Sequence, residues 1–250
     1  MASTGTAGFT LTRDQMITAA LRVLRVLQDG ATAGSNDITN GAETLNVLLK
    51  NAQSHGMMLW TYQLLAIPLV TNQITYTIGP SGANVTSTRP LRLFEGSYIR
   101  NVCVDQTYDT QLRLLSRLEY LQYVNKTVAA IPNSIYYHPG IDLAAGTTSP
   151  STGYGTLYVW PAPVDATRTI YCNFQRPIYD MTATGDEFDL PQEWFQWIKY
   201  QLAAEMADEY EVPEDRIMRL EKKAKFYKDQ LFEWSVETAP VTFTPDLQMR

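Results

Sequence analysis

The sequence predicts an α+β protein in which an N-terminal helical pair and a long C-terminal helical hairpin form a helical bundle. An antiparallel β module is inserted between the two pairs, and an extended C-terminal tail follows. Three observations predict this fold. Apolar residues recur at helical spacing near both ends of the chain, the residues between them form short β-like runs bounded by glycine and proline, and the last residues show no helical period.

The predicted organisation has four parts. We expect a flexible N-terminus at residues 1–11, a helical domain made of residues 12–59 and 190–235, a β-rich domain at residues 60–189, and an extended tail at residues 236–250. A chain of 250 residues, of which 45% are hydrophobic, is long enough to bury a sizeable core.

The first helical pair is predicted from caps and periodicity. Thr12 and Gln15 have the spacing of a capping box, and Asp29-Gly30 is a termination signal. A second helix is expected from about Ile38 to Ser54. The apolar positions of the two helices are Ile17, Leu21, Leu24 and Leu27, and Ala42, Leu45, Leu48, Leu49 and Ala52. These stripes would be buried against each other and against a later part of the chain.

The middle of the chain changes to short β-like runs from Trp60 onward, which predicts about six antiparallel strands. The runs are YQLLAIPLV, QITYTIG, LFEGSYIRNVCV, NSIYYH, TLYVWP and TIYCNFQRP. Ser116, with Glu119 three residues later, predicts the capped start of one short helix. The segment IDLAAGTTSPSTGYG is expected to be a loop.

The stretch DEFDLPQEWFQW marks the return to helix, because Pro191 suits a first helical turn and Glu193 complements the helix dipole. This helix is expected to run to about Glu211, and a second helix to begin around Pro213. Apolar residues in the second helix are spaced alternately 3 and 4 apart, which is typical of a coiled-coil-like seam. They are Ile217, Leu220, Ala224, Tyr227, Leu231 and Trp234.

The charge balance and the cysteines narrow the class of protein. A formal net charge of −6 and a pI near 5.0 argue against tight binding of nucleic acid, which needs an excess of cations. Cys103 and Cys172 lie in apolar runs without a CxxC spacing, so we expect buried free thiols. The start MASTGTAGFT has no signal-peptide pattern, and no apolar run approaches the roughly 20 residues that span a membrane. We therefore expect a soluble chain made in a reducing cytoplasm.

No metal site, cofactor or catalytic motif is predicted. His55 and His138 lie far apart and have no zinc-ligand spacing, and a cysteine nucleophile would need one of them beside it. Asp186, Glu187 and Asp189 have the chemistry of a hydrolase pair or a calcium site. Acids just before a helix are also favoured by the helix dipole alone, and we prefer that structural interpretation.

The C-terminal hairpin carries more apolar and aromatic surface than one domain core consumes, which predicts an interface with other subunits or partners. The predicted interface residues are Trp194, Trp197, Tyr200, Tyr227 and Trp234. The cations of the last helix are nearly balanced by acids, so we expect a solvated face or one that meets an acidic partner rather than DNA. In the tail, Val241 and Phe243 alternate with threonine, as in a strand that is added to a neighbouring sheet.

The order of these segments resembles the head-to-tail adaptor proteins of short-tailed bacteriophages, over most of residues 12–235. The resemblance is carried by AETLNVLLKNAQSHGMMLW in the first helical pair, by IPNSIYYHP and GTLYVWPAPVDATRTIYCNFQRPI in the β segment, and by FDLPQEWFQWIKYQLAAEMADEYEVP at the return to helix. The positions that match are Leu45, Asn46, Leu48, Leu49, Met58, Leu59, Trp60, Tyr136, Tyr137, Leu157, Trp160, Pro161, Leu190, Pro191, Glu193, Trp194, Leu202, Ala203 and Ala207.

This resemblance implies a structural protein of the virion, assembled in the host cytoplasm, with no enzymatic activity, no cofactor and no membrane partner. It would form a ring, usually a dodecamer, beneath the portal protein at the head-tail junction. The ring would seal the DNA exit channel and provide the attachment platform for a tail nozzle or tail tube protein. Genomic double-stranded DNA would pass through without sequence-specific binding, and the C-terminal segment, with Val241, Phe243 and Leu247, would reach the portal protein.

Two alternatives remain open. The chain could be a tail-associated cell-wall hydrolase, with Asp186, Glu187 or Glu193 as acid and base. It could also be a neck or stopper protein of a long-tailed phage, which would differ in the partner below it.

Overall fold

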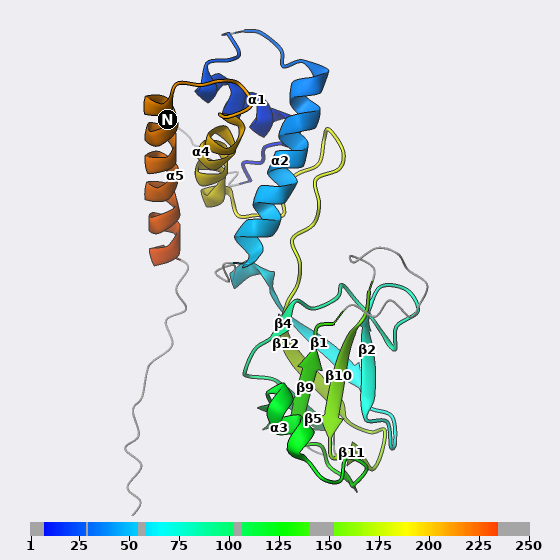
Figure 1. Cartoon of the computed structure of the whole chain (residues 1–250). Coiled ribbons are helices and arrows are strands. Elements are labelled where there is room, and N and C mark those ends of the chain that lie inside the picture. The colour runs from blue at the N-terminus through cyan, green and yellow to red at the C-terminus, as the bar shows by residue number, and fades with distance from the viewer. Residues whose placement is uncertain (1–7, 29, 55–58, 103–106, 141–152, 235–250) are drawn as a thin grey trace, which may run out of the picture. The chain divides into compact units, whose positions relative to one another are not determined.

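The computed structural model describes residues 8–28, 30–54, 59–102, 107–140 and 153–234 (Figure 1). The chain divides into two compact units. The helical unit comprises Met1–Leu59 and Ile178–Arg250, and the β unit comprises Trp60–Pro177.

The predicted fold class, a helical bundle with an inserted β module, is wrong. The described residues form a mixed structure of five α-helices and twelve strands in three sheets. The difference arises largely from strands of two residues, such as Arg92–Leu93 and Ala162–Pro163. Backbone pairing with a neighbour creates these strands, and two residues are too short to show a period in the sequence.

The helical unit contains α1 (Arg13–Leu24), α2 (Ser35–Ser54), α4 (Phe195–Met206) and α5 (Glu214–Trp234). Helix α1 packs against both α2 and α4, and α5 packs along α4 (Figure 1). The fully buried residues are Met16, Ile17, Ala20, Leu45, Ile198, Leu202, Ala203, Met206 and Ala207. A glycine is needed where α2 crosses α1, because a Cβ on Gly41 would lie 2.6 Å from Cγ2 of Ile17.

The ends of α1 follow local rules. The capping box is confirmed, since the Thr12 hydroxyl accepts a hydrogen bond from the Gln15 backbone and the Gln15 side chain accepts one from the Thr12 backbone. The helix ends at Leu24 rather than at Asp29-Gly30. Arg25 takes a left-handed conformation, with φ of 58°, and its N–H donates to the Arg22 carbonyl.

The first helix of the C-terminal hairpin begins later and ends earlier than predicted. Pro191 precedes a 3₁₀ turn, η4 (Gln192–Trp194), and α4 starts only at Phe195. Helix α4 ends at Met206 instead of Glu211, and α5 starts directly after Pro213. The predicted apolar seam of α5 faces α4, where Leu220, Ala224 and Leu231 are buried. The seam therefore holds the unit together, and is not available to a partner.

The β unit consists of two five-stranded sheets and a small third sheet. The first sheet contains β1 (Tyr62–Pro68), β12 (Thr169–Gln175), β5 (Tyr98–Val102), β6 (Thr107–Gln111) and β4 (Arg92–Leu93). The second contains β3 (Val85–Thr86), β2 (Thr75–Gly79), β10 (Gly155–Trp160), β9 (Ser134–His138) and β7 (Arg113–Leu114). The third pairs β8 (Ala129–Ala130) with β11 (Ala162–Pro163). A 3₁₀ turn, η1 (Leu59–Thr61), precedes β1.

The two large sheets share one core. It combines Ile67, Ile99, Ile170 and Phe174 from the first sheet with Tyr76, Ile78, Ile135, Leu157 and Val159 from the second. Within this core the Tyr137 hydroxyl donates to the Pro90 carbonyl at 2.6 Å. Gly155 lies against the same ring, and a Cβ there would be 1.9 Å from the Tyr137 oxygen. On the outer side, α3 (Arg117–Gln122) begins with the predicted Ser116–Glu119 capping box, which is confirmed.

Candidate assembly surface

Cys172 and His138 do not form a nucleophilic pair. Cys172 is buried in the core of the β unit, where burial raises the pKa of its thiol to about 12 and keeps it protonated. His138 is exposed at the end of β9, and its Nδ1 lies 3.5 Å from the Tyr136 hydroxyl. Cys103 and His55, the other thiol and imidazole of the sequence, lie outside the described residues.

The acidic turn before α4 has a structural role. The Asp186 carboxylate accepts hydrogen bonds from the backbone N–H groups of Ala183 and Thr182, at 2.6 and 2.7 Å, and these bonds hold the pKa of Asp186 below its usual value. The Asp186 carbonyl also accepts from the N–H of Arg13, which ties this turn to the start of α1. A carboxylate that stays ionised is poorly suited to be the general acid of a hydrolase.

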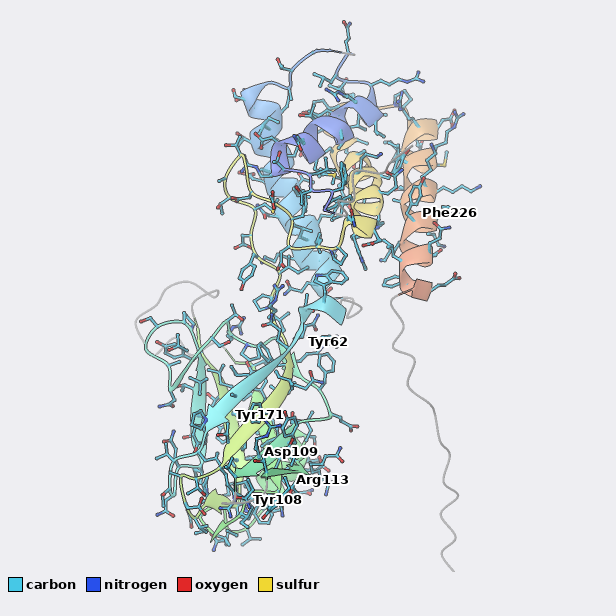
Figure 2. All side chains as sticks on the ribbon, turned by 180° about the vertical axis from the view of Figure 1, so that it is seen from behind. Tyr62, Tyr108, Asp109, Arg113, Tyr171 and Phe226 are labelled. Carbon is cyan, nitrogen blue, oxygen red and sulfur yellow. The ribbon has the colours of Figure 1, made fainter. Side chains whose placement is uncertain are left out.

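The charged residues on the β5–β6 ribbon pair with each other. Arg100 donates two hydrogen bonds of 2.8 Å to Asp109, which is labelled in Figure 2. This hydrogen bonding lowers the pKa of Asp109. The Arg100 guanidinium also lies 4.8 Å from the centre of the Tyr171 ring. Across the described ranges, no group of three or more His, Cys, Asp or Glu could hold a metal ion.

The predicted interface residues have unequal exposure. Trp194 and Trp197 are only 2% and 4% exposed, so they do not form the free surface that the sequence suggested. Their rings meet edge to face at 5.5 Å and belong mainly to the packing of α4. Tyr200 and Tyr227 are half-buried and stack on each other at 5.4 Å, where α4 meets α5. The two tryptophans therefore reach a partner only through a hollow that they line.

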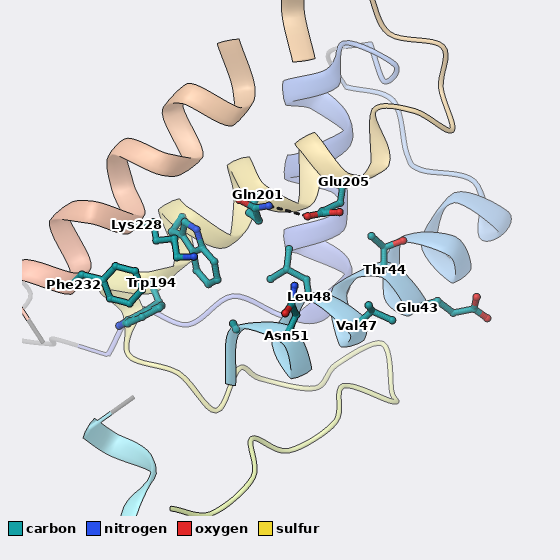
Figure 3. Close-up of a pocket in the computed structure, with 12 residues that line it drawn as sticks. Glu43, Thr44, Val47, Leu48, Asn51, Trp194, Gln201, Glu205, Lys228 and Phe232 are labelled. Carbon is teal, nitrogen blue, oxygen red and sulfur yellow. Dashed lines mark hydrogen bonds between the residues drawn. The ribbon is translucent and has the colours of Figure 1, made fainter. Parts of the chain in front are cut away.

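That hollow is a groove of about 380 Å³ between α2, α4 and α5 (Figure 3), which we call the α2–α5 groove. One wall is α2, the floor is α4, and α5 forms the other wall. The lining residues are Glu43, Thr44, Val47, Leu48, Asn51 and Ala52 from α2, Trp194, Trp197, Gln201 and Glu205 from η4 and α4, and Lys228 and Phe232 from α5. Val47 is 70% exposed. The groove combines aromatic and apolar side chains with two acids, Glu43 on the α2 wall and Glu205 at the α4 floor.

The outer side of α5 carries a different surface. Met218, Lys222 and Phe226 are four residues apart, so they form one ridge along the helix. Met218 is 55% exposed and Phe226, labelled in Figure 2, is 57% exposed. Arg219 and Lys223 lie beside these three residues, and both help to line a second hollow between α1, α4 and α5. We call these five residues the α5 ridge.

The β unit exposes scattered apolar side chains, such as Leu64 and Val102, and concentrates others in one short segment. They lie on α3 and in the residues that follow it, and they are Leu118, Leu121, Val124, Val128 and Ile131. A cluster of this kind is unusual on a surface that only meets water.

Four predicted site residues cannot be placed. The side chain of Trp234, at the end of α5, lies outside the described residues, as do Val241, Phe243 and Leu247. Conversely, the sequence reasoning missed Phe226, Met218, Glu43 and Glu205. The sequence does contain a signal for the first two, because Met218, Lys222 and Phe226 are four residues apart and lie outside the predicted seam of α5.

Comparison with known proteins identifies no relative. No protein-family model matches the chain, and a search of curated proteins found no significant similarity. Within the described residues, no helix combines the length and apolar character needed to cross a membrane. The function must therefore be argued from the residues and surfaces themselves.

Proposed function

We propose that this protein is a structural head-to-tail adaptor of a short-tailed bacteriophage. It forms a ring beneath the portal protein of the filled head, closes the DNA exit channel, and provides the platform on which the tail nozzle assembles. The proposal starts from the resemblance in segment order over most of residues 12–235.

The observation that carries the proposal is exposed apolar surface on both units. The helical unit exposes Val47, Met218 and Phe226, and the β unit exposes a cluster within residues 118–131. Exposed apolar patches on soluble proteins commonly mark sites of protein association. A connector needs at least two such surfaces, because it binds copies of itself and also a second kind of protein.

The charge of the chain is compatible with a channel that DNA passes. A net charge of −6 disfavours general adhesion to a phosphate backbone. The dodecameric order and the location at the head-tail junction come from the resemblance and belong to the same proposal.

The test is reconstitution with the portal ring of the same phage. We expect the purified full-length chain to sediment with portal rings and to appear as an additional ring in electron micrographs. Addition of the nozzle protein should then extend the particle. Protein that stays a monomer in the presence of portal rings would refute the proposal, and binding to a tail-tube protein instead of a nozzle would reassign it as a stopper of a long-tailed phage.

A parallel assay addresses the hydrolase alternative. We expect no peptidoglycan cleavage by the purified chain, because the Asp186 carboxylate is occupied by backbone hydrogen bonds. Cleavage that is lost in Asp186→Asn, Glu187→Gln or Glu193→Gln would favour the enzyme instead.

A further inference from the structure

The helical unit separates its charges into two adjacent blocks. Residues 201–215, from the second half of α4 to the start of α5, contain six acids and no lysine or arginine. Residues 216–228, the middle of α5, contain six cations and one acid, which gives a net charge of +5. Averaging over the whole hairpin conceals this separation, because the two blocks nearly cancel.

Among the described residues, these charges form no ion pairs within one copy. The ion pairs formed among the described residues join Arg13 with Asp14, Lys50 with Asp180, Arg100 with Asp109, Arg113 with Glu119, and Arg168 with Asp165. None of them includes a residue of either block. Intramolecular pairing therefore does not explain why the blocks are there.

Local helix electrostatics does not explain the acidic block either. Glu205 lies in the last turn of α4, with Asp208, Glu209 and Glu211 just beyond it, and this last turn has no basic residue. Negative charge at a helix C-terminus opposes the helix dipole and is therefore unfavourable. Only Glu214 and Asp215, in the first turn of α5, are placed favourably.

The α5 ridge and the α2–α5 groove match in chemistry. The groove is lined by Glu43 from its α2 wall and Glu205 from its α4 floor, and its one cation, Lys228, lies 5.4 Å from the Phe232 ring. The ridge presents Arg219, Lys222 and Lys223 beside the exposed side chains of Met218 and Phe226. Cations would meet acids, and apolar side chains would meet the aromatic and apolar side chains of the groove.

The two surfaces also match in length and position. The ridge extends for about 12 Å from Met218 to Phe226, and the α2 wall extends for about 13.5 Å from Glu43 to Ala52, at 1.5 Å per residue. Helical geometry places Lys228 and Phe232 on the opposite flank of α5 from Arg219 and Lys223, at about 100° per residue. One copy therefore has both surfaces, and neither hides the other.

We propose that the α5 ridge of one copy docks into the α2–α5 groove of a second copy, with Arg219, Lys222 and Lys223 facing Glu43 and Glu205. The contact joins two different surfaces, so each copy keeps a free ridge at one side and a free groove at the other. Head-to-tail contacts of this kind continue from copy to copy and close into a ring when the rotation allows. The inference rests on the proposed ring and specifies the surfaces that build it.

The experiment uses two charge-reversed forms of the full-length protein. The ridge variant is Lys222→Glu with Lys223→Glu, and the groove variant is Glu43→Lys with Glu205→Lys. Each variant alone opposes like charges, so we expect self-association, measured by sedimentation velocity, to weaken about 10-fold or more. An equimolar mixture should recover association, because the acidic ridge of one variant meets the basic groove of the other. Phe226→Ala should also weaken association about 10-fold without lowering the melting temperature.

A matched control carries Arg89→Glu with Arg92→Glu in the β unit, outside the exposed cluster at residues 118–131, and it changes the net charge by the same amount as the ridge variant. Its association should equal that of the wild type, and circular dichroism checks that every variant is folded. The same proteins are then added to portal rings, where the mixture should form the adaptor ring and neither variant alone should.

The outcomes separate the inference from the proposed function. If the wild type and both charge variants assemble equally well on the portal, the proposed adaptor ring is supported and the assigned contact between copies is wrong. If the wild type assembles neither alone nor on the portal, both proposals are wrong. If the wild type binds double-stranded DNA and the ridge variant does not, the cations of α5 form a nucleic-acid surface and the contact between copies is refuted.

Discussion

The helical unit and the β unit bury their apolar residues in different ways. The β unit places its core between two sheets, and the buried Tyr137 hydroxyl finds a partner there in the Pro90 carbonyl. The helical unit packs α1, α2 and α5 around α4, and cylinders in contact leave hollows between them. Its hollows contain aromatic and charged side chains, whereas the hollow of the β unit beside Glu95, Arg113 and Glu119 is mainly polar.

This difference indicates where each unit can bind. In the helical unit the apolar seam of α5 is used within the chain, and the surfaces left over are the α2–α5 groove and the α5 ridge. In the β unit the exposed apolar side chains are concentrated on α3 and the residues after it. We infer that the helical unit is suited to repeated contacts between copies, and that the β unit is suited to a separate partner.

The largest expected effects come from deleting one core side chain in each unit. Leu45 and Leu157 are 0% exposed, so Leu45→Ala and Leu157→Ala should each lower the free energy of unfolding by about 2–5 kcal/mol. Hydrogen exchange measured by mass spectrometry should show loss of protection confined to the unit that carries the change. Val47→Ala, at a position 70% exposed, is the control and should cost less than about 0.5 kcal/mol. Equal loss of protection in both units would show that they unfold as one.

Replacing one glycine in each unit should have an intermediate effect on stability, because the two glycines are packed against different side chains. Gly155→Ala would place a Cβ 1.9 Å from the Tyr137 oxygen and should destabilise the β unit by about 1–3 kcal/mol. Gly41→Ala would place a Cβ 2.6 Å from Cγ2 of Ile17, a less severe overlap, and it gains about 1 kcal/mol of helix propensity, so its net cost should be smaller. Chemical denaturation measures the free energy of unfolding of the two variants. A larger loss for Gly41→Ala than for Gly155→Ala would contradict this prediction.

The smallest effect is a difference in alkaline stability. In the β unit, burial raises the pKa values of Tyr76, Tyr137 and Cys172, and it raises that of Cys172 to about 12. In the helical unit, burial and the hydrogen bond to Asp37 raise the pKa of Tyr210 to about 12. Each group is held in its protonated form, so its stabilising contribution is present below its unfolded pKa, about 9 to 10, and is lost as pH rises toward the folded value.

We therefore expect the β unit to lose stability before the helical unit as pH rises from about 9 to 12. Hydrogen exchange, corrected for its own pH dependence, measures the opening of each unit separately. Tyr210→Phe should remove part of the alkaline dependence of the helical unit and leave that of the β unit unchanged. A helical unit that opens first would contradict the assignment of the more strongly buried groups to the β unit.

Sequence rules succeeded where the physical cause spans a few residues. The capping boxes at Thr12 and Ser116 were predictable because the hydroxyl and the acid or amide that complete each box are three residues apart. Pro191 and Pro213 marked the approach to α4 and α5, since proline fixes φ at a helical value and lacks an N–H. The exact helix ends were not predictable, because the left-handed turns at Arg25 and Glu211 occur at residues with no strong preference for them.

The sequence by itself determined the helical segments and the longer strands, the charge blocks on the C-terminal hairpin, and the lack of recognisable catalytic motifs. These properties depend on residue type and on spacing along the chain. The tertiary structure decided that Trp194 and Trp197 are buried, that the α5 seam is used against α4, and that Phe226 stays exposed. Each of these depends on which face of a helix meets a neighbour, and that neighbour comes from a distant part of the chain.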